Sequence, residues 1–462
     1  MGKSSACAPE RALTGDGHHA EIRLSAWLAA PDAVQMDKWQ QRHNRLQPSV
    51  KFTMPAMHSS SKHCPLESVD RRIRHGRQRL VSHAALLIAL FAGSVWPASA
   101  TVLTPTRDDE VIETLPAASA NRAEERRQRQ QLVANPSDAG LAVQLARRYL
   151  DHARKEGDPR YAGRALAALK AWPTADTAPD EVLLLLATLQ QFLHDFDTSA
   201  ANLERLLKRQ PRHAQAWLTL ATVRRVQGRF DDSSRACDGL GLAGADFYAR
   251  ACRAENDSLR GDSDRARTAI EAMLSAPGLP AESRNWVLTT LAESEARAGR
   301  ADKAELAYRQ ALAAQPDAYT AMSYADFLLE RKRPREALLQ LKGQQRTDAV
   351  LLRLAIAGTQ AGTPEAKADV REMGERIVAA SLRPEARTTH ARELAMYALW
   401  IDKAPGKALE LARENVKHQR ETLDLLVFAQ SAAASKDAAA LREVAALKKS
   451  IGLHDKRLDA LL

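Results

Sequence analysis

Aromatic residues, glycine and cysteine are scarce in this chain. Aromatic side chains make up 5% of the 462 residues, which include only 21 glycines and four cysteines. No stretch shows the alternation of apolar and polar residues that is typical of a half-buried strand, and no strand–helix–strand unit is recognisable. Alanine, leucine and arginine dominate instead, which favours helices and argues against a β-rich fold.

The sequence also lacks the short motifs that carry catalysis. It contains no glycine-rich phosphate loop, no Gly-x-Ser-x-Gly turn and no His-Glu-x-x-His pair. The histidines after residue 100 stand singly, as surface or packing residues do: His152, His194, His213, His390, His418 and His454. We therefore expect a protein that is not an enzyme and that holds no metal or cofactor.

The net charge of +10 is unevenly distributed. Residues 1–100 carry 13 Lys/Arg and 7 Asp/Glu, whereas the remainder carries 54 and 50. Because a nucleic-acid-binding protein gathers basic residues on one face, this nearly balanced body argues against nucleic acid as a partner. We interpret the short basic clusters Arg224–Arg225, Arg331–Lys332–Arg333 and Lys448–Lys449 as solvated helix ends.

A repeat of about 34 residues runs from Asp180 to Pro316. Its clearest unit spans Ala214–Leu240 and places Trp217, Leu220 and Ala221 on one helical face. The other two units have matching offsets, namely Leu183, Leu186, Ala187, Phe196, Ser199, Leu203 and Leu206 in one, and Leu288, Leu291, Ala292, Gly299, Ala304, Tyr308 and Ala311 in the other. Apolar residues at steps of three and four predict two amphipathic helices per unit.

Small residues at two fixed positions predict that the paired helices approach closely. They are Ala187, Ala221 and Ala292 at the eighth position, and Ser199, Ser233 and Ala304 at the twentieth. Gly228 and Gly299 supply the positive φ of a tight turn, and Pro211 and Pro316 end the second helix. One such hairpin cannot bury its own apolar face, so neighbouring hairpins must stack. The alternative is an ordinary helical bundle.

These units resemble the tetratricopeptide repeat. The resemblance extends over Asn121–Leu462, most clearly in the middle, and implies an all-α fold, a right-handed α-solenoid of helix-turn-helix repeats. We expect an N-terminal hairpin over 121–175, regular repeats over 176–345, and divergent repeats with a C-terminal cap over 346–462.

The same resemblance implies that the first helix of each pair lines a concave groove for a partner peptide or helix. The implied groove residues are Gln215, Leu218, Thr222, Arg225, Trp286, Thr289, Glu293, Tyr319, Met322 and Asp326. Trp286, Tyr319 and Met322 would be unusually exposed without a ligand. They could instead pack against the adjacent helix. The Lys and Asn pattern of the family's carboxylate-binding version is missing, so recognition of an acidic C-terminal tail is not expected.

Residues 71–100 have the order of a secretory signal peptide. Five arginines between Arg71 and Arg79 precede an uncharged apolar run, Ala84–Val95, and an Ala-x-Ala ending at Ala100. The run is shorter than the roughly 20 residues that span a bilayer. Cleavage after Ala100 would leave Thr101 at the start of a linker over 101–120.

The residues before this segment show no sustained periodicity. A signal peptide stands at the start of a chain, whereas this one begins only at about residue 71. We therefore expect residues 1–70 to be a non-native or disordered extension, with translation starting at Met57 or near Val69. The alternative is a genuine extension whose apolar run stays uncleaved and anchors the protein in the inner membrane.

Cys7 and Cys64 precede the expected cleavage site, which leaves Cys237 and Cys252. In an exported chain two remaining cysteines can form a disulfide, which over this loop would stabilise the fold by roughly 3 kcal/mol. The alternative is two buried thiols at packing positions, and the spacing fits no zinc site.

Taken together, these features predict a non-catalytic scaffold or adaptor in the periplasm of a bacterium, with another envelope protein as its partner. Two alternatives stay open. One is a membrane-anchored adaptor in secretion or surface-polymer export, and the other is a helical subunit of an enzyme with an unrecognised site.

Overall fold

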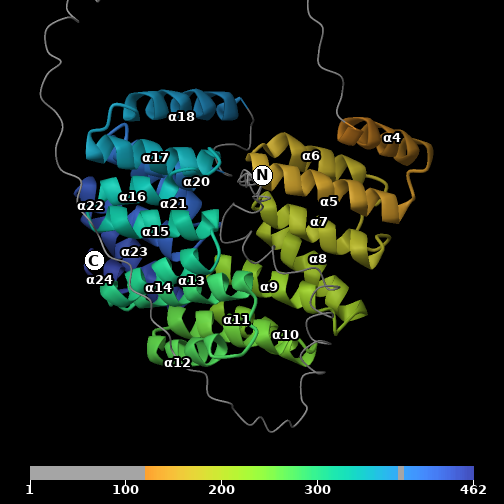
Figure 1. The fold of residues 1–462 in the computed structure, drawn as a ribbon, viewed down its shortest axis with the longest axis horizontal. Coiled ribbons are helices and arrows are strands. Elements are labelled where there is room, and N and C mark those ends of the chain that lie inside the picture. The colour runs from red at the N-terminus through yellow and green to blue at the C-terminus, as the bar shows by residue number, and fades with distance from the viewer. Residues whose placement is uncertain (1–119, 383–389) are drawn as a thin grey trace, which may run out of the picture. The chain divides into compact units, whose positions relative to one another are not determined.

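Helices follow one another through the whole of the chain that the structure, a computed structural model, describes: residues 120–382 and 390–462 (Figure 1). Within these ranges all regular secondary structure is helical, which confirms the all-α prediction. The expected signal peptide, the linker over 101–119 and the segment before them lie outside the described residues.

Most of the helices pair into successive hairpins, each made of an A helix and a B helix. The A helices are α5 (Ala139–Glu156), α7 (Asp180–Phe192), α9 (Ala214–Val226), α11 (Asp246–Leu259), α13 (Ala281–Arg297), α15 (Ala318–Glu330), α17 (Asp348–Ala361), α20 (Ala391–Trp400) and α22 (Thr422–Ala434). The B helices are α6 (Pro159–Ala168), α8 (Phe196–Arg209), α10 (Phe230–Leu242), α12 (Ser263–Leu274), α14 (Ala301–Ala314), α16 (Pro334–Leu341), α18 (Ala366–Ser381), α21 (Pro405–Asn415) and α23 (Ala438–Ile451).

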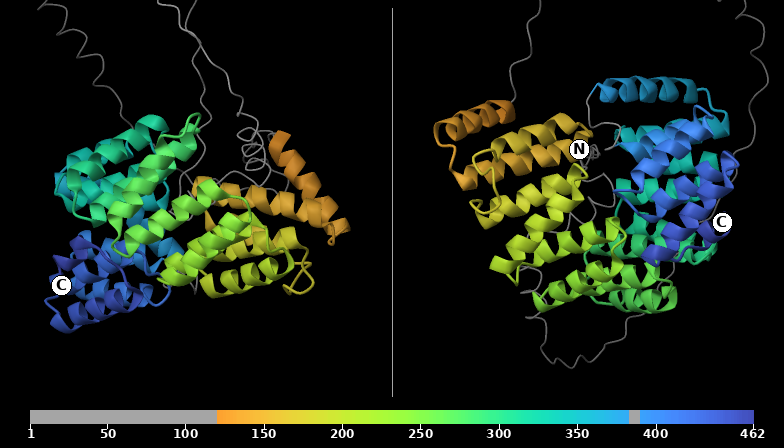
Figure 2. Two further views of the ribbon diagram at one scale, coloured as in Figure 1. Left: turned by 90° about the horizontal axis from the view of Figure 1, so that it is seen from below. Right: turned by 180° about the vertical axis from the view of Figure 1, so that it is seen from behind.

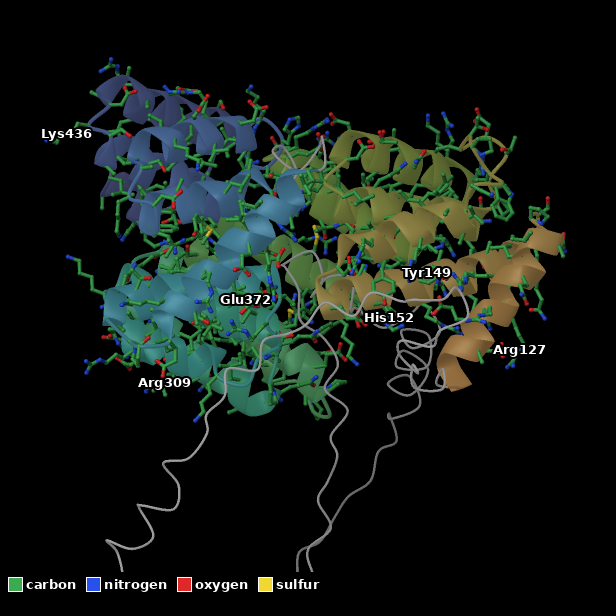
Figure 3. All side chains as sticks on the ribbon, turned by 90° about the horizontal axis from the view of Figure 1, so that it is seen from above. Arg127, Tyr149, His152, Arg309, Glu372 and Lys436 are labelled. Atoms are coloured by element: carbon green, nitrogen blue, oxygen red, sulfur yellow. A yellow bond between two sulfur atoms is a disulfide. The ribbon has the colours of Figure 1, made fainter. Side chains whose placement is uncertain are left out.

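Among the described residues, two further helices stand outside the pairs. They are α4 (Ala120–Ala134) at the N-terminal end and α24 (Lys456–Asp459) at the C-terminal end. Tyr149 of α5 donates a hydrogen bond to Glu125 of α4 at 2.9 Å. Figure 3 labels Tyr149 among the N-terminal helices. Burial, together with this bond, raises the pKa of Tyr149 to about 12, so the hydroxyl remains a donor at neutral pH. The N-terminal unit thus contains α4 in addition to the hairpin of α5 and α6.

Close approach within each hairpin follows from its small residues. Ser199 on α8 donates to the carbonyl of Ala187 on α7 at 2.7 Å, and Ser233 on α10 donates to Ala221 on α9 at 2.8 Å. All four residues are buried. A larger side chain at either position would separate the helices and break the bond, so the spacing of small residues sets the geometry of the hairpin.

The apolar faces of neighbouring hairpins form three successive core clusters. One cluster joins buried residues from α5 to α11, and a second joins residues from α11 to α17. The third joins residues from α17 to α24 and also includes Phe230 of α10 and Leu259 of α11. Each hairpin therefore buries its apolar face against the next hairpins in the chain. This arrangement confirms the tetratricopeptide-like α-solenoid that the sequence predicted.

The C-terminal helices return to the middle of the chain and contact the turns between its A and B helices (Figures 1 and 2). We call residues 419–462 the closing segment. The backbone N–H of Arg420 donates to the carbonyl of Val226 at 2.7 Å, and that of His454 donates to Leu259 at 2.8 Å. Val226 and Leu259 end successive A helices, α9 and α11. The closing segment thus satisfies carbonyl groups that a helix end otherwise leaves unpaired.

Side chains extend this contact to the flanking repeats. The Gln419 amide lies 3.0 Å from Nδ1 of His194, which follows α7, and Arg457 bonds Glu330 at the end of α15 at 3.0 Å. The closing segment therefore touches the A–B turns from α7 to α15.

None of the helices that the structure describes is both long and apolar enough to cross a bilayer.

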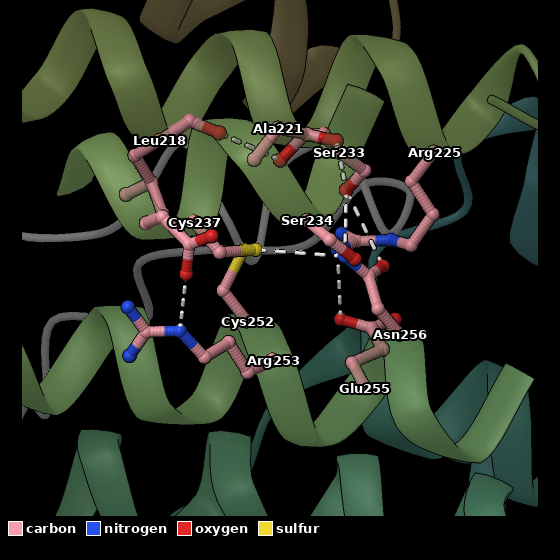
Figure 4. Close-up of a disulfide and its surroundings, with 12 residues drawn as sticks. Leu218, Ala221, Arg225, Ser233, Ser234, Cys237, Cys252, Arg253, Glu255 and Asn256 are labelled. Atoms are coloured by element: carbon pink, nitrogen blue, oxygen red, sulfur yellow. Dashed lines mark hydrogen bonds and ion pairs between the residues drawn. A yellow bond between two sulfur atoms is a disulfide. The ribbon is translucent and has the colours of Figure 1, made fainter. Parts of the chain in front are cut away.

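A disulfide joins Cys237 of α10 to Cys252 of α11 (Figure 4). Their Cα atoms lie 5.7 Å apart, and both residues are fully buried. The bond links the B helix of one hairpin to the A helix of the next. It therefore fixes the stacking of two hairpins in addition to their shared apolar core.

We expect removal of the disulfide to destabilise the protein. The bond closes a loop of 15 residues, for which the chain-entropy model gives about 3 kcal/mol. The Cys237→Ala/Cys252→Ala variant should unfold at a lower temperature than the wild type in a calorimetric scan. A reductant should lower the wild-type midpoint toward that of the variant and leave the variant unchanged. A wild-type midpoint that does not respond to reductant would contradict this expectation.

A second prediction concerns Gly261, in the turn after α11. Its φ is +98°, and a Cβ there would lie 2.8 Å from the His454 ring. Gly244 has a φ of +86° and nothing within 4 Å of such a Cβ. Both alanine variants lose about 1 kcal/mol to the left-handed backbone, but Gly261→Ala should lose more because it also displaces the closing segment. Equal losses in the unfolding free energy would show that the contact with His454 contributes nothing.

Candidate functional site

A cavity of about 120 Å³ lies among the A helices of the later repeats. Its walls come mostly from α13, α15, α17, α20 and α22, and Tyr308 of α14 and Arg457 of α24 complete the lining. Four of the ten implied groove residues line it: Glu293, Tyr319, Met322 and Asp326. The structure therefore brings together implied positions from two successive A helices, and it adds residues from the C-terminal third of the chain.

The wall formed by α13 and α15 is centred on Glu293. The hydroxyl groups of Tyr319 and Ser323 both donate to its carboxylate, that of Ser323 at 3.0 Å. Glu293 and Tyr319 are both half-buried, so this wall presents a carboxylate beside an aromatic ring.

An ion pair between α15 and α17 forms the next part of the wall. Arg353 donates two hydrogen bonds to Asp326, from Nε at 2.9 Å and from a terminal nitrogen at 2.6 Å. This two-bond geometry fixes the plane of the guanidinium group and is among the stronger forms of ion pair. The negative charge of Asp326 is therefore balanced by Arg353 within the protein itself.

The opposite wall contains a buried ion-pair cluster around Arg392 of α20. Its Nε bonds Asp424 at 2.6 Å, and a terminal nitrogen bonds Glu421 at 2.7 Å. Asn415 adds a bond to the same Asp424 carboxylate at 2.6 Å. The Asp424 side chain is fully buried, so it depends on these partners for its charge to be tolerated.

Sequence reasoning did not find the residues of this opposite wall. Arg392, Glu421 and Arg457 lie in the divergent part of the chain, where no motif or regular spacing marks them. Their pairing with the middle repeats is visible only in the folded chain.

The implied groove residues on α9 are placed differently from the expectation. Thr222, Arg225 and Leu218 are at most 4% exposed. The Thr222 hydroxyl bonds the Leu218 carbonyl, and Arg225 forms an ion pair with Glu255 of α11 at 3.2 Å (Figure 4). Gln215 is half-buried, and its amide lies 3.4 Å from the Thr219 hydroxyl. The neighbouring A helix covers this face, so a partner cannot reach it.

Three residues on α13 and α15 also depart from the expected exposure. Thr289 is 2% exposed and shares a hydrogen bond with Thr320, while Met322 is 4% exposed. Trp286 is half-buried, with its ring centroid 5.8 Å from that of Tyr248 on α11. Packing against adjacent helices therefore accounts for Trp286 and Met322 without a ligand, and only Met322 of the two lines the cavity.

The interpretation of Arg224–Arg225 as a solvated helix end was wrong. Both residues are less than a tenth exposed. Arg224 forms an ion pair with Glu204 of α8 and Arg225 with Glu255 of α11. The ends of A helices lie between neighbouring repeats, and carboxylates from those repeats neutralise the arginines.

The family model of the tetratricopeptide repeat matches residues 184–240 and 289–343. These two stretches are tetratricopeptide repeats. The first contains α8 and α9 and most of α7 and α10. The second contains part of α13 and all of α14–α16, and it includes the cavity residues of α13 and α15. No curated protein matches the chain.

Tetratricopeptide repeats support a general role in protein interaction, and proteins built from them are usually non-catalytic. Among the described residues, no group of three or more His, Cys, Asp or Glu side chains is arranged to hold a metal ion. The cavity therefore offers charged and aromatic side chains for recognition.

We expect the loss of Arg392 alone to destabilise the protein strongly, because its buried carboxylate partners remain. Arg392→Met leaves Asp424 and Glu421 without their cation, and loss of one partner of a buried ion pair costs about 3–5 kcal/mol. Lys407→Met removes an exposed cation that lies 3.5 Å from Asp402, which is worth at most about 1 kcal/mol. Urea unfolding of both variants measures the difference. Equal losses would mean that solvent screens Asp424 despite its burial.

Proposed function

We propose that this protein is an exported, non-catalytic scaffold of the bacterial cell envelope, and that it binds a segment of another envelope protein in the cavity among α13, α15 and α17. The observation that carries the proposal is the meeting of Glu293, Tyr319, Met322 and Asp326 at one cavity within tetratricopeptide repeats. These positions come from A helices, which line the ligand groove in the family that the sequence resembles.

Two features support an oxidising, exported location. Residues 71–100 have the composition of a signal peptide. The buried disulfide between Cys237 and Cys252 is typical of proteins that fold outside the reducing cytosol. On this proposal the mature protein begins at Thr101 and works in the periplasm.

The site is better suited to binding than to chemistry. Asp326 is held by Arg353, and Glu421 by Arg392. Carboxylates that are fixed in this way orient a ligand, but they do not readily exchange protons with it. A rigid, charged cavity of this kind favours recognition of a partner's side chain.

The test is capture of a partner from an envelope fraction of the native bacterium. The bait is the full chain with a C-terminal tag, expressed in that host and recovered from the periplasmic extract. The intact mass of the recovered bait should be that of a chain that begins at Thr101. The Tyr319→Ala bait, which removes the ring beside Glu293, should lose the captured protein.

Tyr161→Ala serves as the matched control, because Tyr161 is half-buried on α6 and is not among the cavity residues. It should capture the partner as well as the wild type does, with the helical content of all baits equal by circular dichroism. Equal capture by the Tyr319→Ala bait would remove the cavity from the proposal. Recovery of the bait only from the cytosol would overturn the exported location.

A further inference from the structure

Carboxylates outnumber guanidinium groups on the walls of the cavity. Its five acidic residues are Glu293, Asp326, Glu330, Glu393 and Glu421, and its four basic residues are Arg297, Arg353, Arg392 and Arg457. Two more carboxylates, Asp424 and Asp455, stand behind the walls and bond Arg392 and Arg457. The described residues thus leave an excess of negative charge around the cavity.

The arginines of the cavity already bind groups of the protein. Arg353 bonds Asp326 through two nitrogens. Arg457 bonds Glu330 at 3.0 Å and Asp455 at 2.7 Å. An anionic ligand would have to break such pairs and leave their carboxylates without a cation, which costs several kcal/mol where the group is buried. The site therefore disfavours an anion.

Glu393 is different from the other acidic residues of the cavity. It lies on α20 beside Arg392, and it is half-buried. Among the residues described by the structure, no other side chain donates a hydrogen bond to its carboxylate. Burial opposes its ionisation, but the charges of Arg392, His390 and His194 outweigh that effect and hold its pKa below the usual range. A backbone hydrogen bond within Glu393 also lowers this pKa. Glu393 thus presents an ionised carboxylate to the cavity without a hydrogen bond from another described side chain.

Glu330 shows that burial in this cavity disfavours an ionised carboxylate. Burial raises its pKa above the ordinary value, although Arg457 opposes the shift. A further cation close to these walls would stabilise the ionised forms of both Glu330 and Glu393.

We propose that the cavity takes a basic side chain, a guanidinium or ammonium group, from the partner segment, with Glu393 as its counter-ion. This inference rests on the proposed function and names the chemistry of the group that is recognised. The alkyl part of such a side chain can lie against apolar wall residues such as Met322, Phe327 and Leu426.

A side chain fits this site better than a metal ion. The carboxylates alternate with arginines, and no cluster of three potential ligands exists among the described residues. The cavity of about 120 Å³ admits one extended side chain or a few water molecules, and it is too small for a folded element.

The experiment measures binding of a capped amino acid to the full chain by saturation-transfer NMR and isothermal titration. The probe is N-acetyl-arginine amide, which resembles an arginine within a peptide. N-acetyl-citrulline amide has nearly the same shape without the charge. We expect saturable binding of the arginine probe, and binding of the citrulline probe that is weaker by about tenfold or more, as expected for the loss of one ion pair in a partly buried site.

Glu393→Gln should weaken binding of the arginine probe by a similar factor, because the substitution removes the charge and preserves the shape of the side chain. Glu375→Gln is the matched control, since Glu375 is 71% exposed on α18 and is not a cavity residue. It should leave the affinity unchanged. Failure of the arginine probe to saturate, equal affinity for the citrulline probe, or an unchanged Glu393→Gln affinity in a folded variant would each overturn the proposal.

Free arginine separates a partner side chain from a small metabolite. Its added ammonium and carboxylate groups have no counterpart within a peptide, so the capped probe should bind at least as tightly. Tighter binding of free arginine would indicate that the ligand is a small metabolite and not a partner segment, and it would overturn the inference.

The two proposals fail in distinguishable ways. Capture of a partner that depends on Tyr319 but not on Glu393, together with no binding of the arginine probe, would refute the basic-side-chain inference alone. Charge-dependent binding of the arginine probe without any captured protein would refute the scaffold proposal, but the cation-binding site would stand.

Discussion

The return of the closing segment to the A–B turns is the constraint on which the site depends. Helix ends leave carbonyl groups unpaired, and here the backbone of Arg420 and His454 supplies donors to Val226 and Leu259. The glycine within each of these turns lets the segment come close, since a Cβ at Gly228 would lie 3.1 Å from Ile451. Without this contact, Arg457 would not reach Glu330, and the cavity would lose one of its sides.

Closing the repeats in this way places many charges where water is limited. The protein responds by pairing arginine with carboxylate across neighbouring helices, as in Arg225 with Glu255 and Arg392 with Asp424. Such pairs contribute little net stability compared with apolar packing, because desolvation offsets most of their attraction. Their geometry does fix which helices lie side by side. Glu393, to which no other described side chain donates a hydrogen bond, is for this reason the carboxylate that we propose as the counter-ion of a ligand.

The hairpins could be predicted from sequence because their signals are local. The spacing from Ala187 to Ser199 lies within one unit, and it corresponds to a real hydrogen bond between two helices. The groove positions were harder, because transferring them from the family ignores how far the next A helix covers Thr222 and Arg225. The wall formed by Arg392 could not be predicted, because its partners belong to helices without a regular repeat. Local periodicity specifies the units, whereas the path of the solenoid decides which of their faces stay open.

The closing contact also makes early repeats depend on residues far along the chain. The carbonyls of Val226 and Leu259 precede the backbone groups that bond them by 194 and 195 residues. A chain that is cleaved before Arg420 lacks both donors, so the ends of α9 and α11 lose these hydrogen bonds. Proteolysis at one end of the protein would therefore leave unpaired carbonyl groups in its middle repeats.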